Sequence, residues 1–204
     1  IGCGLAGHRI IINGTPGNAL GAYLDGAELI VRGNAQDAAG DTMDSGLIVI
    51  EGNAGDAAGY AMRGGEIFIK GSVGYRAGIH MKEYNQKRPA LVIGGSAGSF
   101  LGEYQAGGVI IVLGLGSRGP IVGNFCGTGM HGGEIFLRAE LFEGALPKQV
   151  CARKAQKEDL ARIEGYIRSF CDYFDYSFSE VFQHEFLVLS PNTGNPYRQL
   201  YTPN

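Results

Sequence analysis

Short apolar runs rich in β-branched residues recur along the first two thirds of the chain, and glycine-rich stretches separate them. They read ELIVR, LIVIE, EIFIK, ALVIG, VIIVL and EIFLR. Such runs after glycine turns are typical of short strands. The stretches between them show no apolar spacing of helical period. The pattern therefore predicts six strands and no helix before the runs stop at Arg138.

These runs belong to a repeat of 19 residues, each copy of which starts with a glycine. Successive copies start 19, 19, 19, 24 and 19 residues apart, at Gly14, Gly33, Gly52, Gly71, Gly95 and Gly114. Two copies carry insertions. One lies within KEYNQKRPA (82–90), and the other, GLGSRG (114–119), stands at the front of the last copy.

The length of the repeat restricts how its strands can pair. Nineteen residues are too few for a strand, a crossover helix and a return. The remaining arrangement stacks each strand over the equivalent strand of the preceding copy, ~4.8 Å away. We therefore predict an all-β fold, a single-stranded right-handed parallel β-helix of about six 19-residue turns.

Equivalent positions of the repeat carry similar residues, as stacking requires. One position holds a mostly sulfur-containing column, made of Leu24, Met43, Met62, Met81 and Met130. We interpret this column as a core filling rather than a stripe that binds a soft metal. Asn34 and Asn53 are likewise expected to form a short amide ladder between stacked turns.

Beyond the repeat, residues 156–174 carry apolar residues at helical spacing. We predict a helix there that caps the open end of the stack or lies along its flank, because an open end exposes unpaired backbone. One more apolar run follows at 186–189, and then a tail that either docks on the stack or reaches into a partner subunit. We divide the chain into a β-helix at 1–140 and a C-terminal helix with a docking tail at 141–204.

Composition narrows the functional classes. Of the 204 residues, 35 are glycine, about 17% (35/204) against a usual share of ~7%, and 45% are hydrophobic. This composition favours a tightly turning chain with a hydrophobic core over a disordered chain. A net charge of −3 argues against nucleic-acid binding by charge. We find no apolar run that predicts a membrane span and no signal-like segment. Four dispersed cysteines favour reduced thiols in a cytoplasmic protein.

A serine motif arises within the repeat. Residues 94–98 (GGSAG) fit G-x-S-x-G, the nucleophile elbow of serine hydrolases. That elbow needs a strand-to-helix turn, but another glycine turn follows here. Ser96 also occupies the repeat position of Asn34, Asn53 and Ser72. We therefore interpret the match as a by-product of the repeat and keep an esterase that uses Ser96 as a remote alternative.

A nucleotide-like motif has the same origin. Residues 114–119 (GLGSRG) fit G-x-G-x-x-G and follow a predicted strand. Dinucleotide binding requires a helix to begin there, so that its amide groups meet the pyrophosphate. Pro120 and further glycines follow instead. We expect no bound nucleotide.

Two sets of polar residues are candidates for metal binding or catalysis. Asp37 and Asp56 occupy equivalent places on adjacent turns, and we expect solvated carboxylates, or a pair offset by Arg76, rather than a calcium site. A second set, His80, His131 and Cys126, lies on turns of the fourth and sixth copies without an acidic partner at a matching position. We expect structural roles for all of them, and predict no catalytic, cofactor-binding or metal-binding residue.

The repeats as a set resemble a known family. The phrases GNAQDAAGDTMDSG, GYAMRGGEIFIKG, EYQAGGVIIVLG and GNFCGTGMHGGEIFLR are similar to the C-terminal GXGXG domain of the large subunit of glutamate synthase. The same repeat resembles a subunit of formylmethanofuran dehydrogenase and one of methylamine–glutamate methyltransferase. The resemblance covers about residues 14–138.

The resemblance implies a non-catalytic structural subunit, or domain, of a glutamate synthase-like oxidoreductase complex. In that family glutamine hydrolysis and the FMN- and iron–sulfur-dependent reductive amination of 2-oxoglutarate lie on other domains, so we expect both cofactors on partner subunits. The expected partners are those subunits, with a homo-oligomer as a further possibility. The alternative is the equivalent subunit of one of the other two complexes.

Overall fold

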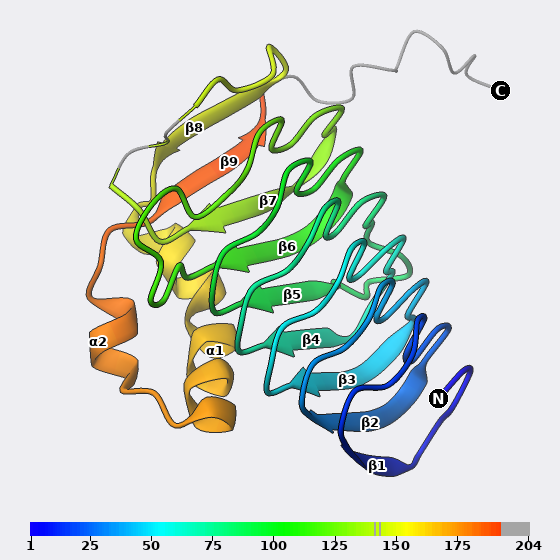
Figure 1. Ribbon diagram of the computed structural model, residues 1–204. Helices are drawn as coiled ribbons and strands as arrows, with labels where there is room; N and C mark the ends of the chain where they lie inside the picture. Colours follow the sequence, from blue (N-terminus) through cyan, green and yellow to red (C-terminus); the bar gives the residue numbers. More distant parts are fainter. Residues whose placement is uncertain (141, 143, 193–204) are drawn as a thin grey trace, which may run out of the picture.

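The described part of the protein is mostly β, with one large mixed sheet and two short helices (Figure 1). The computed structural model describes residues 1–140, 142 and 144–192. The strands are β1 (Arg9–Asn13), β2 (Asp25–Arg32), β3 (Ser45–Ile50), β4 (Glu66–Ile69), β5 (Ala90–Ile93), β6 (Ala106–Val112), β7 (Gly132–Leu137), β8 (Val150–Lys154) and β9 (Leu187–Pro191). The helices are α1 (Lys157–Phe174) and α2 (Phe178–Phe182). The nine strands lie in the order β1-β2-β3-β4-β5-β6-β7-β9-β8.

Strands β1 to β7 are parallel and pair in chain order, one strand from each copy of the repeat. The register follows the repeat, since Leu29 of β2 lies opposite Ile48 of β3, which lies opposite Ile67 of β4. The insertions do not break this register, because the loops absorb them. The prediction that each strand lies over its equivalent in the preceding copy is therefore confirmed.

A second ladder ties the copies together before each strand begins. It consists of isolated parallel bridges between consecutive turns, joining Ala35, Ala54, Val73, Ala97 and Val122 in series. Each copy thus contacts the next along a strand and also along a loop, as the stacked coils of Figure 1 show. Two ladders on different parts of one turn hold that turn parallel to its neighbours.

Strand β1 adds one layer that the six predicted strands do not include. Its run, RIIIN, pairs in parallel with β2 in the repeat register, with Ile10 opposite Leu29. The pattern did not reveal it because the residues before Gly14 do not contain a full copy of the repeat. At this edge of the sheet Ile11 is 48% exposed.

The interior of the stack is apolar and includes the mostly sulfur-containing column. Leu24, Met43, Met62, Met81 and Met130 are all fully buried, as predicted for a core filling. In the fifth copy Gln105 occupies the equivalent position and is also fully buried, with its Nε2 donating to the carbonyls of Gly107 and Gly108. The alternate residues of each strand face the other side of the sheet, where α1 packs.

The helix predicted at 156–174 is α1, and it lies along the flank of the stack (Figure 1). Its apolar face, with Ile163, Ile167 and Phe170, packs against outer sheet residues such as Phe68 and Ile111. It therefore does not cap the open end. In the part of the chain that the structure describes, no helix is long and apolar enough to cross a membrane.

The end of the parallel stack is covered by two antiparallel strands. Strand β9, which contains most of the predicted apolar run at 186–189, pairs with β7, and Val188 lies opposite Phe136. Strand β8 then pairs with the other edge of β9. Strand pairing, and not a helix, thus satisfies the open backbone of the last copy. The rest of the predicted docking tail, 193–204, lies outside the described residues.

The close approach of turns gives a testable prediction at Gly46. Its φ is +103°, and a Cβ there would lie 2.4 Å from the carbonyl oxygen of Ala27 in the preceding turn. We expect Gly46→Ala to lower the free energy of unfolding by about 2–4 kcal/mol, because the backbone of two turns must move apart. Urea unfolding followed by circular dichroism measures this.

Gly165 provides the matched control. It is exposed in α1, and a Cβ there meets nothing within 4 Å. Gly165→Ala is expected to stabilise the protein by about 0.5–1 kcal/mol through helix propensity. Equal effects of the two substitutions would contradict the close contact between turns.

Candidate functional site

Polar side chains on the turns form ladders that link one copy to the next. The Oδ1 atom of Asn34 accepts a hydrogen bond from the backbone N–H of Asn53 at 2.9 Å, and Oδ1 of Asn53 accepts one from the N–H of Ser72 at 2.8 Å. The predicted amide ladder therefore exists, but it runs from side chain to backbone. These groups stabilise the stack by satisfying amides of the next turn.

Asp37 and Asp56 form a second ladder of the same kind. The N–H of Asp56 donates to Oδ1 of Asp37 at 2.9 Å, and the N–H of Tyr75 donates to Oδ1 of Asp56 at 2.7 Å. Arg76 does not offset this pair, because its guanidinium forms an ion pair with Glu103 at 2.9 Å. Among the described residues, no group of three His, Cys, Asp or Glu side chains is placed to hold a metal.

Ser96 lies in the corresponding ladder of the later turns. Its N–H donates to Oγ of Ser72 at 3.0 Å, and the two hydroxyls lie 3.2 Å apart. Ser96 also lines a groove beside Pro120 and Asn124, and no described residue of this lining is a histidine or a carboxylate. The geometry therefore does not place a general base beside this serine.

The glycine motif at 114–119 forms a loop in which three backbone amides are already paired. The N–H of Gly114 donates to the carbonyl of Gly95, that of Leu115 to Gly94, and that of Ser117 to Gly114. The chain then passes Pro120 and turns back into the stack without a helix. A bound pyrophosphate requires a row of free amides at a helix N-terminus, and no helix begins at this loop.

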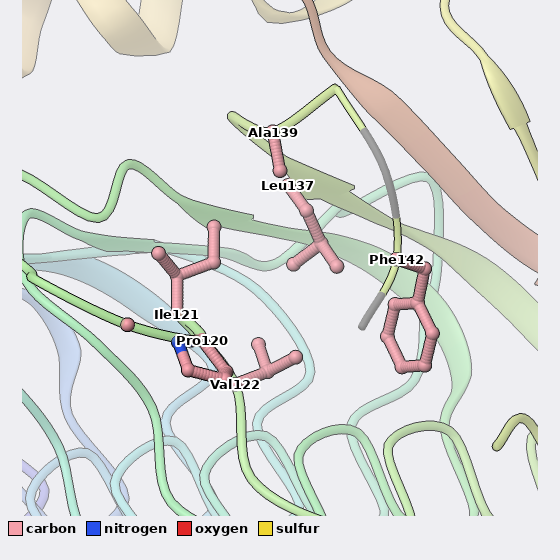
Figure 2. Close-up of a pocket in the computed structure, with 7 residues that line it drawn as sticks. Pro120, Ile121, Val122, Leu137, Ala139 and Phe142 are labelled. Carbon is pink, nitrogen blue, oxygen red and sulfur yellow. The ribbon is translucent and has the colours of Figure 1, made fainter. Parts of the chain in front are cut away.

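A small apolar cavity lies beside this loop (Figure 2). Its volume is about 80 Å³, and Val122, Leu137 and Phe142 are among its lining residues. The described lining carries no titratable side chain. The cavity therefore belongs to the packing between the last turn and the segment that follows β7.

Cys126, His80 and His131 do not converge. Cys126 is fully buried in the core, and burial raises the pKa of its thiol to about 12, so it remains protonated at neutral pH. His80 and His131, however, both line one surface hollow. The sequence pattern placed them on separate turns without indicating that they share a surface.

This hollow is rich in rings and cations. Its walls are formed by Tyr60, Ala61, Arg63, His80, Lys82, Tyr104, Ala106 and His131. The ring of His80 stacks on that of Tyr104, with centroids 5.2 Å apart and planes inclined by 10°. The sequence analysis missed this arrangement, although an alignment of the copies would have shown aromatic residues at neighbouring turn positions.

The insertion at 82–90 anchors distant turns to each other. Lys87 forms an ion pair with Asp44 of the second copy. The adjacent Arg88 reaches the last copy, where its guanidinium lies 3.0 Å from a carboxylate oxygen of Glu134 in β7. The insertion loop therefore connects the second copy to the sixth through ion pairs.

A chain of charges continues from this loop to α1 and β8. Glu134 also pairs with Arg162 of α1 at 2.6 Å, and Arg162 pairs with Asp159 at 2.6 Å. Arg153 of β8 forms two hydrogen bonds with Asp159, whose side chain is 5% exposed. The hydrogen bonds from Arg153 hold the pKa of Asp159 well below its usual range. This ion network fixes α1 on the flank of the stack.

The stacked copies, their ladders and the apolar interior define a repeat scaffold, a class in which each unit is stable only against its neighbours. The sequence matches the GXGXG motif family over residues 3–191. The chain therefore belongs to that family, which is the family of the C-terminal domain of the glutamate synthase large subunit.

A relative is also found among curated proteins. The chain is similar to an uncharacterized protein of Methanocaldococcus jannaschii, with 44% identity over 133 residues. The match covers 62% of this chain and 51% of the relative. The chain thus spans about half the length of the curated relative that it matches.

The ion network predicts a pH dependence of stability. The pKa of Asp159 is lower in the folded state than in the unfolded state, so the ionised side chain stabilises the fold. This contribution to the free energy of unfolding is fully present above the unfolded pKa of ~3.9 and is lost as the pH falls toward the folded pKa. Asp159→Asn should lower the free energy of unfolding at pH 7 by about 1–3 kcal/mol. This difference should shrink by about 1 kcal/mol between pH 5 and pH 3, measured by urea unfolding.

The exposed pair of Glu164 and Arg168 in α1 is the control for this experiment. Glu164→Gln should change stability by less than about 0.5 kcal/mol at every pH, because solvent screens the pair. If the effect of Asp159→Asn were independent of pH, the proposed source of the stabilisation would be wrong.

Proposed function

We propose that this chain is a non-catalytic assembly subunit, or domain, of a glutamate synthase-like complex. The family match over residues 3–191 is the observation that carries the proposal, because it includes the stack and its C-terminal elements. On this proposal the chain holds an amidotransferase component and an FMN- and iron–sulfur-containing oxidoreductase component in position. Both cofactors belong to those partners, and this chain acts in the cytoplasm.

The use of polar groups in the stack supports an architectural role. Asp37, Asp56 and Ser96 are engaged with neighbouring turns, and the thiol of Cys126 is buried and protonated. Catalytic groups usually lie together in a cleft with pKa values matched to their task. Most of the candidate groups of this sequence instead contribute to cohesion between copies.

We also propose that the stack is a right-handed parallel β-helix within residues 1–140, and that the described residues of the C-terminal part, 142 and 144–192, form a separate segment that packs on it. The parallel register of one strand per copy and the second ladder through Ala54 and Val73 support this geometry. A crossover between parallel neighbours is right-handed in nearly all proteins, which supports the hand. A stiff rod of this kind would hold partner components at fixed separations.

Reconstitution tests the proposed function. The purified chain is expected to form no glutamate from glutamine, 2-oxoglutarate and a reductant. With the amidotransferase and oxidoreductase components of its own cell, glutamate should form at least about tenfold faster than with the two components alone, because the scaffold brings them together. Glutamate is measured by chromatography.

Three outcomes would overturn the proposal. Glutamate formation at an equal rate without this chain would show that it is not needed for assembly. Stable co-purification with the subunits of another complex, such as formylmethanofuran dehydrogenase, would assign the chain to that complex. Hydrolysis of a short acyl ester that is lost in Ser96→Ala would instead establish the esterase alternative.

A further inference from the structure

Two columns of aromatic rings stand on the turns that precede the strands. In the first column, Phe100 lies between Tyr75 and Phe125, with ring centroids 6.4 Å and 4.9 Å away. In the second, His80 lies between Tyr60 and Tyr104, at 6.1 Å and 5.2 Å. We call these six residues the aromatic face. The exposed fractions of Tyr75 and Phe125 are 52% and 56%.

The two columns lie close together. In the fifth copy, Phe100 and Tyr104 stand at either end of one tight turn, in which the N–H of Glu103 donates to the carbonyl of Phe100. The ion pair between Arg76 and Glu103 joins neighbouring turns at the same place. The two columns of the aromatic face are therefore neighbours on the turns of the third to sixth copies.

The fold does not require rings at these positions. Phe100 and Phe125 have φ values of 63° and 61°, in the left-handed region, which costs roughly 1 kcal/mol for a residue with a side chain. The equivalent residues of the first three copies are Ala19, Ala38 and Ala57, in the same conformation. Alanine therefore suffices for the turn, and the large exposed rings of the later copies need another explanation.

Positively charged side chains lie beside the rings. Arg63 and Lys82 line the hollow of the second column and form no ion pair among the described residues. The Nε of Arg63 is buried without a hydrogen-bond partner there. The described lining of this hollow contains no carboxylate, while Arg63 also lines a second hollow together with Asp25 and Asp44. Arg76 adds a guanidinium 5.1 Å from the centre of the Phe100 ring.

We propose that the aromatic face docks a segment of a partner protein that presents carboxylates beside apolar side chains. Exposed rings and arginine are the residues that dominate protein interfaces, and the cations select an acidic partner by charge complementarity. Carboxylates of the segment pair with Arg63 and Lys82, while its apolar side chains cover Phe100 and Phe125. This inference rests on the proposed assembly function and locates one of its contacts.

A protein partner fits these observations better than a nucleic acid. Binding to a phosphate backbone needs many clustered cations, whereas this chain carries a net charge of −3 and the face offers only a few. Two columns of three rings each, on turns ~4.8 Å apart, instead match the dimensions of a short peptide segment, whose residues are spaced by ~3.3 Å.

Site-specific photo-crosslinking tests the proposal. The photoreactive residue p-benzoylphenylalanine replaces either Phe125 or Tyr173 in the full chain expressed in its own cell. Tyr173 is the control, because it is an aromatic residue that is 43% exposed but lies in α1, outside the aromatic face. We expect position 125, and not position 173, to crosslink to one protein, at a peptide rich in Asp and Glu.

The captured partner is then purified, and its affinity is measured by calorimetry. Phe125→Ala and Lys82→Glu should each weaken binding at least about tenfold, and Tyr173→Ala should leave it within about twofold. Raising the salt concentration should weaken binding of the wild type more than that of Lys82→Glu. Circular dichroism checks that each variant folds.

Several results would overturn the proposal. The first is a crosslink at both positions or at neither. The second is a crosslink to a second copy of this chain or to nucleic acid. The third is an unchanged affinity of both variants for the partner. If both variants still supported glutamate formation in the reconstituted system, the docking surface would be wrong while the assembly function stood. If the wild type failed in that system, the assembly function itself would fail.

Discussion

Every other feature of this molecule depends on the main-chain hydrogen bonds that join one copy of the repeat to the next. Because the copies share one length apart from two insertions that the loops absorb, the strands of consecutive copies meet in one register, and Leu29, Ile48 and Ile67 lie opposite one another. In these regular layers, similar side chains lie above one another. The apolar column, the polar ladders and the aromatic rings are consequences of that alignment.

The side chains divide by their place on the turn. Those that point inward, such as Met62, fill a narrow core, and those on the outer face of the strands, such as Phe68, receive α1. Polar residues at the turns, such as Asn53 and Asp56, satisfy amides of the following copy. The rings of the aromatic face are not used in this way and stay partly exposed.

Much of this arrangement follows from the sequence, because periodicity in the chain becomes periodicity in space. For that reason the sequence predicts the strand positions, the buried column that contains Met62 and the helix at 156–174. The pattern did not predict where α1 packs. An amphipathic sequence shows that one face of a helix is buried, but it does not show which part of the protein covers that face. It also missed β1 and β8, which lie outside the repeat, and the ion network through Asp159, which joins residues far apart in the chain.

Disulfide trapping tests the stacked register most directly. Glu51 and Lys70 are exposed and lie at the same position of adjacent turns, about one strand spacing apart, whereas Arg32 and Lys70 are two turns apart, ~10 Å. In a chain whose exposed Cys3 and Cys151 are replaced by serine, Glu51→Cys with Lys70→Cys should form a disulfide on mild oxidation, and Arg32→Cys with Lys70→Cys should not. Crosslinking of the second pair and not the first would contradict the account.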